Sequence, residues 1–388
     1  MRSAVVVDVV RTPSGKGKPG GQLSGVHPVD LLAGVLQELA ARNDLDPALI
    51  EDVIGGCVSQ AGEQSLNITR NAVLAAGFPE AVPATTLDRQ CGSSQQATHF
   101  AAQGVLAGAY DVVVACGVES MSRVPMFSSV GKADPFGEKL KARYPQGLVP
   151  QGISAELIAA RWKLDRAALD AYSAQSHRRA AAATEAGAFA REVVPVGDAR
   201  TDETVRASTT VEGLAGLKPS FYDPAAAERF PEIDWRITPG NSSPLSDGAS
   251  AALIVEEETA SRLGLVPRAR FRAFTVVGDD PVLMLTGIMP ATERVLAKAG
   301  LTIDDLDAYE VNEAFAPVPL AWLAETGADP AKLNPRGGAI ALGHPLGASG
   351  TKLLATLLGT LEDTGGRYGL QTMCEGGGMA NAMILERL

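Results

Sequence analysis

Short apolar segments alternate with helical patterns at both ends of this 388-residue chain, and this order restricts the fold. Residues 3 to 9 and 111 to 116 are runs of small and β-branched residues bounded by turn signals, which is typical of strands buried on both faces. Between them, residues 28 to 41 carry leucine and valine at the spacing of an amphipathic helix. The pattern predicts an α/β protein with buried strands flanked by helices.

The last third of the chain repeats the order of elements with hardly any shared residues, which is a sign of duplication. Residues 121 to 245 differ from both ends, because Pro, Gly, Lys and Arg become more frequent, and they indicate an inserted domain. Further helices are expected at 67–76, 95–106, 154–188 with breaks at Asp165 and Gly187, 290–299, 316–326 and 349–363. Further strands are expected at 246–256 and 308–311, with a terminal hairpin of 368–374 and 380–385 around a glycine turn.

The charge distribution argues against nucleic acid as a partner. The formal net charge is -11, whereas binding to a phosphate backbone calls for a basic face. Residues 131 to 236 contain 15 basic and 15 acidic residues, so the whole acidic excess lies outside this segment. We expect an anionic ligand to be tolerated best in the middle of the chain.

The four cysteines occur singly, with no Cys-x-x-Cys pair, so neither a zinc site nor a disulfide scaffold is predicted. No apolar run approaches the roughly 20 residues of a membrane span. The chain starts with the strand-like Ala4-Val5-Val6-Val7 and not with a basic-then-apolar leader. It ends in Glu386-Arg387-Leu388, which is not a peroxisomal signal of the Ser-Lys-Leu type. We therefore expect a cytoplasmic protein without a membrane segment.

Cys91 lies where a predicted helix begins, in Asp88-Arg89-Gln90-Cys91-Gly92-Ser93-Ser94. A thiol attacks as its thiolate, and a helix N-terminus favours that negative charge. The two serines are predicted helix caps, and the backbone N–H of Cys91 could serve as an oxyanion donor. The alternative is a buried core cysteine, which is the role expected for Cys57 and Cys116.

His344 stands in a glycine-rich loop, residues 337 to 350, before an apolar helix. The glycines let the backbone approach a ligand and leave the imidazole as the only large polar group. This setting favours a functional histidine over a structural one. We expect the other three, His27, His99 and His177, to be structural or exposed.

Cys374 directly precedes Glu375-Gly376-Gly377-Gly378, whose backbone N–H groups could hold an oxyanion, and a second thiol there could serve as acid and base. Asn312 follows a predicted strand and is a candidate for positioning a water or a carbonyl, although asparagine is also common in turns and caps. Two cysteines and a histidine, each among small residues, suggest carbon–carbon bond chemistry on acyl thioesters.

Taken in order, these motifs resemble the thiolase family over essentially the whole chain. The resemblance rests on Cys91 in its Asp-Arg-Gln-Cys-Gly context, Asn312-Glu313-Ala314-Phe315, Gly343-His344-Pro345 and Cys374-Glu375-Gly376-Gly377-Gly378. It also includes Glu119-Ser120-Met121-Ser122-Arg123 and Pro239-Gly240-Asn241-Ser242-Ser243. It implies a five-layer αβαβα sandwich of two similar βαβαβαββ halves with an inserted loop domain. The implied division is 1–120 plus 246–270 for the N-terminal half, 121–245 for the loop domain and 271–388 for the C-terminal half.

The resemblance implies a role for each matching residue. Cys91 would hold the acyl group, and His344 would activate it. His344 and a water held by Asn312 would bind the thioester oxygen of the second substrate. Cys374 would remove or return the α-proton of acetyl-CoA. The N–H groups of Cys91 and Gly376 would form the hole for the acyl-enzyme oxygen.

The resemblance makes coenzyme A a substrate and implies no bound cofactor and no metal. Ser243 would hydrogen-bond the pantetheine, and Arg206 would face the adenine. The implied partners are coenzyme A, acyl-CoA thioesters and further copies of the chain, as a homodimer or homotetramer.

Two departures from the family pattern bear on the substrate. Gln151 stands where biosynthetic acetoacetyl-CoA thiolases commonly carry a Met that narrows the acyl pocket, so a wider pocket is expected. Residues 221 to 238 form a longer segment than in many relatives. The sequence around Cys91 is most similar to thiolases that degrade fatty acids and steroid side chains.

The leading hypothesis is a degradative, reversible 3-ketoacyl-CoA thiolase of fatty-acid or related β-oxidation, acting on medium, long or bulky chains. The close alternative is an acetoacetyl-CoA-specific acetyl-CoA C-acetyltransferase. A β-ketoacyl synthase would need His or Asn in place of Cys374, and a papain-like protease lacks the terminal Cys-Glu-Gly-Gly-Gly. A noncatalytic acyl-CoA-binding relative would be expected to have lost one of the two thiols, and both are present.

Overall fold

The computed structural model describes residues 2–388, and its strands form two groups that meet edge to edge. The first group consists of β1 (Ala4–Arg11), β2 (Gly15–Lys16), β3 (Asp52–Gly56), β4 (Ala84–Leu87), β5 (Val112–Ser120) and β6 (Ser246–Glu256). The second consists of β7 (Ala269–Gly278), β8 (Ala308–Val311), β9 (Tyr368–Glu375) and β10 (Met379–Arg387). The order across both is β4-β3-β5-β6-β1-β7-β10-β9-β8, with β2 on β6. Two residue pairs, Val5 with Arg270 and Val6 with Ala269, join β1 to β7.

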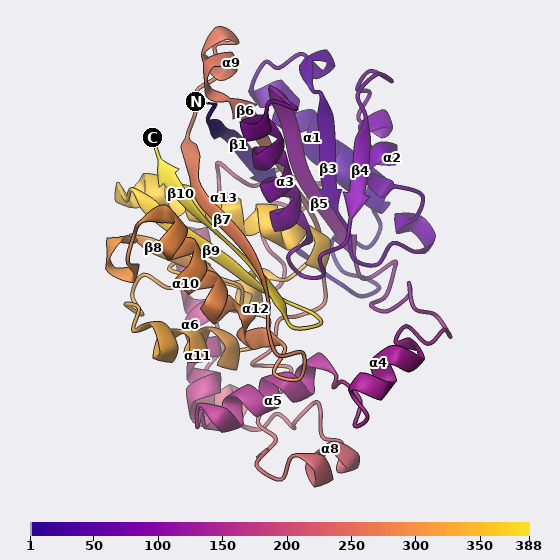
Figure 1. Cartoon of the computed structure of the whole chain (residues 1–388), viewed down its shortest axis with the longest axis vertical. Coiled ribbons are helices and arrows are strands. Elements are labelled where there is room, and N and C mark those ends of the chain that lie inside the picture. The colour runs from indigo at the N-terminus through magenta and orange to yellow at the C-terminus, as the bar shows by residue number, and fades with distance from the viewer. Residues whose placement is uncertain (1) are drawn as a thin grey trace.

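Helices cover the outer faces of both strand groups and fill the space between them (Figure 1). The outer layer on the first group is α1 (Pro28–Arg42) and α2 (Ile68–Ala75), and on the second it is α10 (Ile288–Ala299) and α11 (Pro317–Thr326). The central layer is α3 (Ser93–Ala107) and α13 (Ser349–Thr364), whose apolar side chains contact strands of both groups. The predicted five-layer αβαβα order is therefore confirmed.

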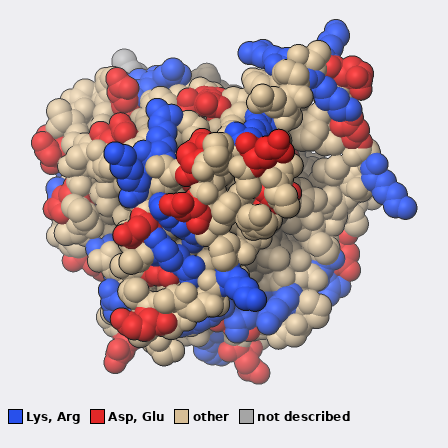
Figure 2. Space-filling view, turned by 90° about the horizontal axis from the view of Figure 1, so that it is seen from below, with Lys and Arg blue, Asp and Glu red and all other residues tan. Residues whose placement is uncertain are grey.

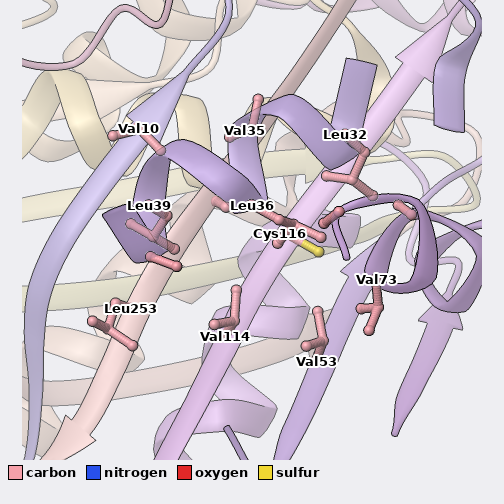
Figure 3. Close-up of a cluster of buried hydrophobic side chains, with 14 of the residues drawn as sticks. Val10, Leu32, Val35, Leu36, Leu39, Val53, Val73, Val114, Cys116 and Leu253 are labelled. Carbon is pink, nitrogen blue, oxygen red and sulfur yellow. The ribbon is translucent and has the colours of Figure 1, made fainter. Parts of the chain in front are cut away.

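The periodic leucines of the first predicted helix form one wall of the N-terminal core. Figure 3 shows Leu32, Leu36 and Leu39 of α1 packed over Val53 and Val114 of the sheet. Each such side chain contributes roughly 1.5–3 kcal/mol when it is fully buried. Cys57 and Cys116 belong to the same cluster and are fully buried, as the sequence predicted for core cysteines.

The two halves differ by one strand. The N-terminal order β1-α1-β3-α2-β4-α3-β5-β6 follows the βαβαβαββ pattern once the short β2 is set aside. In the C-terminal half, Leu333 lies between α11 and α13, where the first half has β4, and it forms an isolated parallel bridge with Tyr309 of β8. A single bridge cannot extend a sheet, so the duplication is incomplete at this edge.

The segment between β5 and β6 consists of five helices joined by loops. Its elements are α4 (Gly137–Arg143), α5 (Gln151–Arg161), α6 (Arg166–Glu185), α7 (Val211–Ala215) and α8 (Pro224–Arg229). The first predicted break falls at the N-cap of α6, where Asp165 Oδ1 accepts the backbone N–H of Ala168 over 2.7 Å. In Figure 1, α4, α5 and α8 lie below the strands, and the face seen from that side carries basic and acidic side chains interspersed (Figure 2).

Two short helices complete the elements, α9 (Glu257–Arg262) after β6 and α12 (Ala339–Leu342) before the histidine loop. Within residues 2–388, every helix is too short or too polar to cross a membrane. The division into residues 1–120 plus 246–270, 121–245 and 271–388 stays a prediction.

Candidate active site

Two helices begin side by side in the central layer and bring the predicted residues together. The backbone N–H of Thr351 in α13 donates to Ser94 Oγ in α3 over 3.1 Å. From the neighbouring sheet, Asn381 Nδ2 in β10 donates to the carbonyl oxygen of Gly92 over 3.0 Å. The predicted nucleophile and the predicted histidine come shortly before α3 and α13, respectively, so the fold places both at one junction.

Cys91 lies in a tight turn between β4 and α3. Gln90 has a left-handed φ of 50°, so the chain reverses just before the thiol. The N-cap of α3 is Gly92, without a side-chain hydrogen bond, and the prediction that Ser93 and Ser94 cap the helix is wrong. The two serines lie inside the first turn, and their hydroxyls bond the preceding turn and the neighbouring helix instead.

The Cys91 thiol is buried, with 6% exposure, against Leu353 and Met373. Burial, with a smaller contribution from Glu375, raises the pKa of this thiol to about 12, although a hydrogen bond with the Gln151 side chain acts in the opposite direction. The position before a helix does not offset burial, so the thiol carries its proton at neutral pH. A base must therefore accept that proton as the sulfur reacts.

Cys374 lies near the end of β9 and is fully buried. Burial raises the pKa of its thiol well above the usual range, and the next largest contribution comes from Cys91. Both cysteines are free. The two thiols are thus close enough to interact electrostatically, which the sequence alone could not show.

The His344 ring is buried and held in one tautomer. Its Nδ1 lies 2.5 Å from Ser349 Oγ, and that hydroxyl donates to the carbonyl oxygen of Pro345 over 2.9 Å. Because the hydroxyl proton goes to Pro345, Nδ1 carries the ring proton and Nε2 is an acceptor, 3.4 Å from Asn312 Nδ2. Burial, aided by Lys352, lowers the pKa of His344 to about 3, so the ring is neutral at pH 7 and its Nε2 is unprotonated, although the lower pKa also makes it a weaker base.

Two buried ionisable residues, Lys352 and Glu119, hold the loop around His344. Lys352 Nζ donates to the carbonyl oxygen of Gly343 over 2.9 Å. From the N-terminal half, Glu119 at the end of β5 accepts the backbone N–H of Gly347 over 2.9 Å, as well as two N–H groups of the loop after β3. The histidine loop is therefore anchored from both sides.

Asn312 directly follows β8, and the next residue, Glu313, fixes this segment. The Glu313 carboxylate accepts from Tyr172 Oη over 2.8 Å, from Ser176 Oγ over 2.7 Å and from the Ile340 N–H over 3.1 Å. Within residues 2–388, Asn312 Oδ1 is buried without a hydrogen-bond partner. Asn312 also lines a cavity of about 10 Å³, which is near the room that one water needs.

The remaining predicted residues are Gly376, Ser243 and Arg206, and their surroundings differ. Gly376 begins the turn after β9, and a side chain there would come within 2.9 Å of Gln90 Oε1, beside the nucleophile. Ser243 is half-buried, and its N–H donates to the carbonyl oxygen of Ala314 over 3.0 Å, close to Asn312 in the chain. The Arg206 side chain is exposed, and within residues 2–388 its guanidinium makes no hydrogen bond or ion pair.

The other three histidines have separate settings. His27 caps α1, where its Nδ1 accepts the N–H of Val29 over 3.3 Å. His177 is buried, and its Nδ1 accepts the backbone N–H of Arg206 over 3.2 Å. His99 is buried and stacks on Phe274. These settings agree with structural roles.

Sequence reasoning missed three polar contacts of the site. It treated Gln151 as a wall of the acyl pocket and not as a partner of the Cys91 sulfur, and it gave Lys352 and Glu375 no role. The signal for Lys352 was a lone lysine in the apolar part of a helix whose other charged residues, Glu362 and Asp363, lie in its last turn. The sequence around Gln151 and Glu375 gives no sign of these contacts, because the residues that they contact lie far away in the chain.

Comparison with known proteins agrees with this arrangement. Residues 4–258 match the thiolase N-terminal domain and residues 265–387 match the thiolase C-terminal domain. A steroid 3-ketoacyl-CoA thiolase, FadA6, of Mycobacterium tuberculosis is 50% identical, with 100% of this chain and 95% of the relative covered. The 3-ketoacyl-CoA thiolases of Escherichia coli and Pseudoalteromonas translucida are each 43% identical over 100% of both chains. The chain belongs to the thiolase family of acyltransferases.

Proposed function

We propose that this chain is a degradative 3-ketoacyl-CoA thiolase, which cleaves a 3-ketoacyl-CoA with coenzyme A into acetyl-CoA and a shortened acyl-CoA. The observation that carries the proposal is that two buried thiols, Cys91 before α3 and Cys374 near the end of β9, are close enough to interact electrostatically. The names of the relatives support the degradative direction over an acetoacetyl-CoA-specific enzyme.

In the first half-reaction Cys91 is the nucleophile. His344 Nε2 takes the thiol proton, and the sulfur adds to the C3 carbonyl carbon of the substrate. The backbone N–H groups of Cys91 and Gly376 stabilise the oxyanion. The bond between C2 and C3 then breaks, and its electron pair stays on C2 as the enolate of acetyl-CoA. The acyl group remains on the sulfur as a thioester.

The enolate needs its own stabilisation and a proton. His344 and a water on Asn312 bind the enolate oxygen, a role supported by the unpartnered Oδ1 of Asn312. Cys374 gives its proton to C2, and acetyl-CoA leaves. In the second half-reaction Cys374 takes the thiol proton of an incoming coenzyme A, whose sulfur displaces Cys91 from the acyl group, and His344 returns its proton to the departing Cys91 thiolate.

The preferred acyl group is medium, long or bulky, as in fatty-acid or steroid side-chain degradation. Gln151 supports this preference, because it stands where a Met narrows the pocket of acetoacetyl-CoA thiolases. Ser243 is proposed to bond the pantetheine and Arg206 to face the adenine. The exposed guanidinium of Arg206 leaves room for a ligand, since no other residue within 2–388 engages it.

The wider setting follows from the family resemblance. Coenzyme A and acyl-CoA thioesters are the partners, and coenzyme A acts as a substrate, with no bound cofactor. We propose that the chain assembles as a homodimer or homotetramer and that it works in the cytoplasm. Light scattering in solution tests the assembly, and a monomer would contradict it.

The acyl-enzyme is the direct test of the function. Wild-type protein and Cys91→Ala are mixed with 3-ketoacyl-CoAs of different chain lengths, without free coenzyme A, and their intact masses are measured. We expect an acyl adduct on the wild type alone, with the dominant mass reporting the preferred chain. Cys116→Ala, which removes a core thiol, serves as the matched control and should still form the adduct.

The outcomes separate the candidate functions. An adduct only from acetoacetyl-CoA would support the acetoacetyl-CoA-specific alternative. The absence of an adduct from every substrate would overturn the acyl-cysteine mechanism.

A further inference from the structure

Glu375 is a buried carboxyl group beside the reactive thiols that the mechanism above does not use. Its side chain is fully buried, and within residues 2–388 neither carboxylate oxygen has a hydrogen-bond partner. A buried, ionised and unpaired carboxylate is costly, whereas the neutral acid is tolerated and supplies a donor. The lack of partners therefore calls for an explanation.

A second buried acceptor without a partner lies at the same place. Asn381 Oδ1 is buried and unpartnered within residues 2–388, while its Nδ2 donates to the Gly92 carbonyl oxygen over 3.0 Å. A side chain at Gly92 would overlap Glu375 Oε1 and lie 2.7 Å from Asn381 Nδ2. Both side chains thus pack against the residue that follows Cys91.

A proton on the Glu375 carboxyl would give both Glu375 and Asn381 Oδ1 a hydrogen-bond partner. A carboxylate and an amide oxygen are both acceptors and cannot bond, but a carboxylic acid donates to an amide oxygen. We propose that Glu375 is a neutral acid in the working enzyme, that it shares its proton with Asn381 Oδ1, and that the pair positions the Cys91–Gly92 turn while keeping negative charge away from the sulfur.

The charged groups around Glu375 agree with the neutral form. Burial raises the pKa of this carboxyl to about 8, Asp88 acts in the same direction and Arg89 opposes it. Arg89 forms no ion pair with it in the described chain, and its Nη1 lies 3.8 Å from Met379 Sδ. The remaining titratable neighbours are the thiols of Cys91 and Cys374, which are themselves protonated.

The consequence for Cys91 has a definite sign. Negative charge on Glu375 raises the pKa of the Cys91 thiol, so ionisation of the carboxyl opposes formation of the thiolate. Protonated, Glu375 exerts no such effect. Above about pH 8 Glu375 of the wild type becomes ionised. The reactivity of Cys91 should therefore rise less steeply with pH in the wild type than in a variant whose residue 375 stays neutral.

The experiment measures alkylation of Cys91 by iodoacetamide across pH, followed by mass spectrometry of the Cys91 peptide. Glu375→Gln keeps a donor for Asn381 and cannot ionise. We expect its rate to equal that of the wild type near pH 7 and to exceed it by about ten-fold near pH 9.5, the change that one pKa unit produces. Coincident profiles would overturn the proposal, as would a slower reaction of the variant near pH 7.

The matched control is Glu310→Gln. Glu310 on β8 is also fully buried with both oxygens unpartnered in the described chain, but it does not contribute to the pKa of Cys91. Its replacement should leave the alkylation profile of Cys91 unchanged. A change equal to that of Glu375→Gln would show that any buried carboxyl has the effect and would contradict the proposal.

A second measurement observes the carboxyl group directly. Infrared difference spectra between the wild type and Glu375→Gln near pH 7 should show a protonated carboxyl band that is lost from the wild type as Glu375 ionises between about pH 7 and pH 10. Its absence near pH 7 would overturn the proposal.

The proposal rests on the assigned role of Cys91, and the tests keep the two apart. Neither alkylation nor the infrared band needs substrate, whereas the acyl adduct does. A missing adduct with the expected alkylation profiles would defeat the thiolase mechanism alone. An adduct with coincident profiles would defeat the role of Glu375 alone.

Discussion

Asn312 Nδ2 lies 3.4 Å from His344 Nε2, while the opposite ring nitrogen of His344 bonds Ser349 Oγ. The first residue follows β8 and the second precedes α13, so two separate elements define one imidazole orientation. Because the ring is neutral, the Nε2 lone pair is available to accept a proton, which a general base requires. Each of the following predictions tests one contact of this centre or of the core around it.

Ser349→Ala removes the acceptor that holds the Nδ1 proton of His344. We expect kcat to fall by about ten-fold or more with little change in KM, because the tautomer is no longer fixed and general-base catalysis contributes about 10²–10⁴-fold. Steady-state kinetics measure it. Thr360→Ala is the matched control, since in the described chain that hydroxyl bonds only the carbonyl oxygen of Thr356 within α13. An unchanged kcat in Ser349→Ala would contradict the tautomer assignment.

Glu119→Gln weakens the anchor of the histidine loop. One acceptor oxygen becomes a donor that faces the backbone N–H groups of Ser59 or Gly347, and each buried donor left unpaired costs roughly 1–3 kcal/mol. Urea unfolding should show a lower free energy of unfolding, and kcat should fall as well. The exposed Glu228→Gln should change neither quantity. Wild-type stability in Glu119→Gln would show that the carboxylate does not hold the loop.

Gln151→Met removes the side-chain hydrogen bond with the Cys91 sulfur. The pKa of the thiol should rise further, because that bond lowers it, and alkylation of Cys91 near pH 8 should slow several-fold. The bulk of the Met should also move the preferred substrate toward shorter acyl chains. Gln103→Met, on the exposed face of α3, serves as the control. Equal alkylation rates would place the amide away from the sulfur.

His99 makes folding sensitive to acid. Burial lowers its pKa from 6.5 to about 3, and both ring nitrogens lack partners in the described chain, so the folded protein holds the ring neutral. The unfolded chain binds the proton below about pH 6.5, so this contribution to stability is complete above that value and is lost as the pH falls toward 3.

The test of His99 compares urea unfolding near pH 7 and near pH 5. The loss of stability should be smaller in His99→Leu than in the wild type by roughly 2 kcal/mol. His27→Asn keeps an acceptor at the cap of α1 and should leave the wild-type loss unchanged. Equal losses in His99→Leu and the wild type would mean that the folded protein accommodates the charged ring.

Most elements could be predicted because their signals are local. The leucine spacing of α1, the apolar runs of β1 and β6 and the break at Asp165 are all visible in a short window of sequence. The start of α3 was placed two residues late with the wrong caps. A serine can bond the helix in front of it or a neighbouring helix, and only packing against α13 decides between them.

The sequence by itself determined the order of the elements, the residue types of the site and the family, because these depend on periodicity and on motifs that each span a few residues. Only the tertiary structure decided that Cys91 is a protonated thiol and that Glu375 lies beneath Gly92. The pKa of a buried group sums the desolvation and charges of all its neighbours, and these neighbours come from β9, α5 and the turn before α3. No window of the chain contains them together, so the electrostatics of the site exist only in the folded molecule.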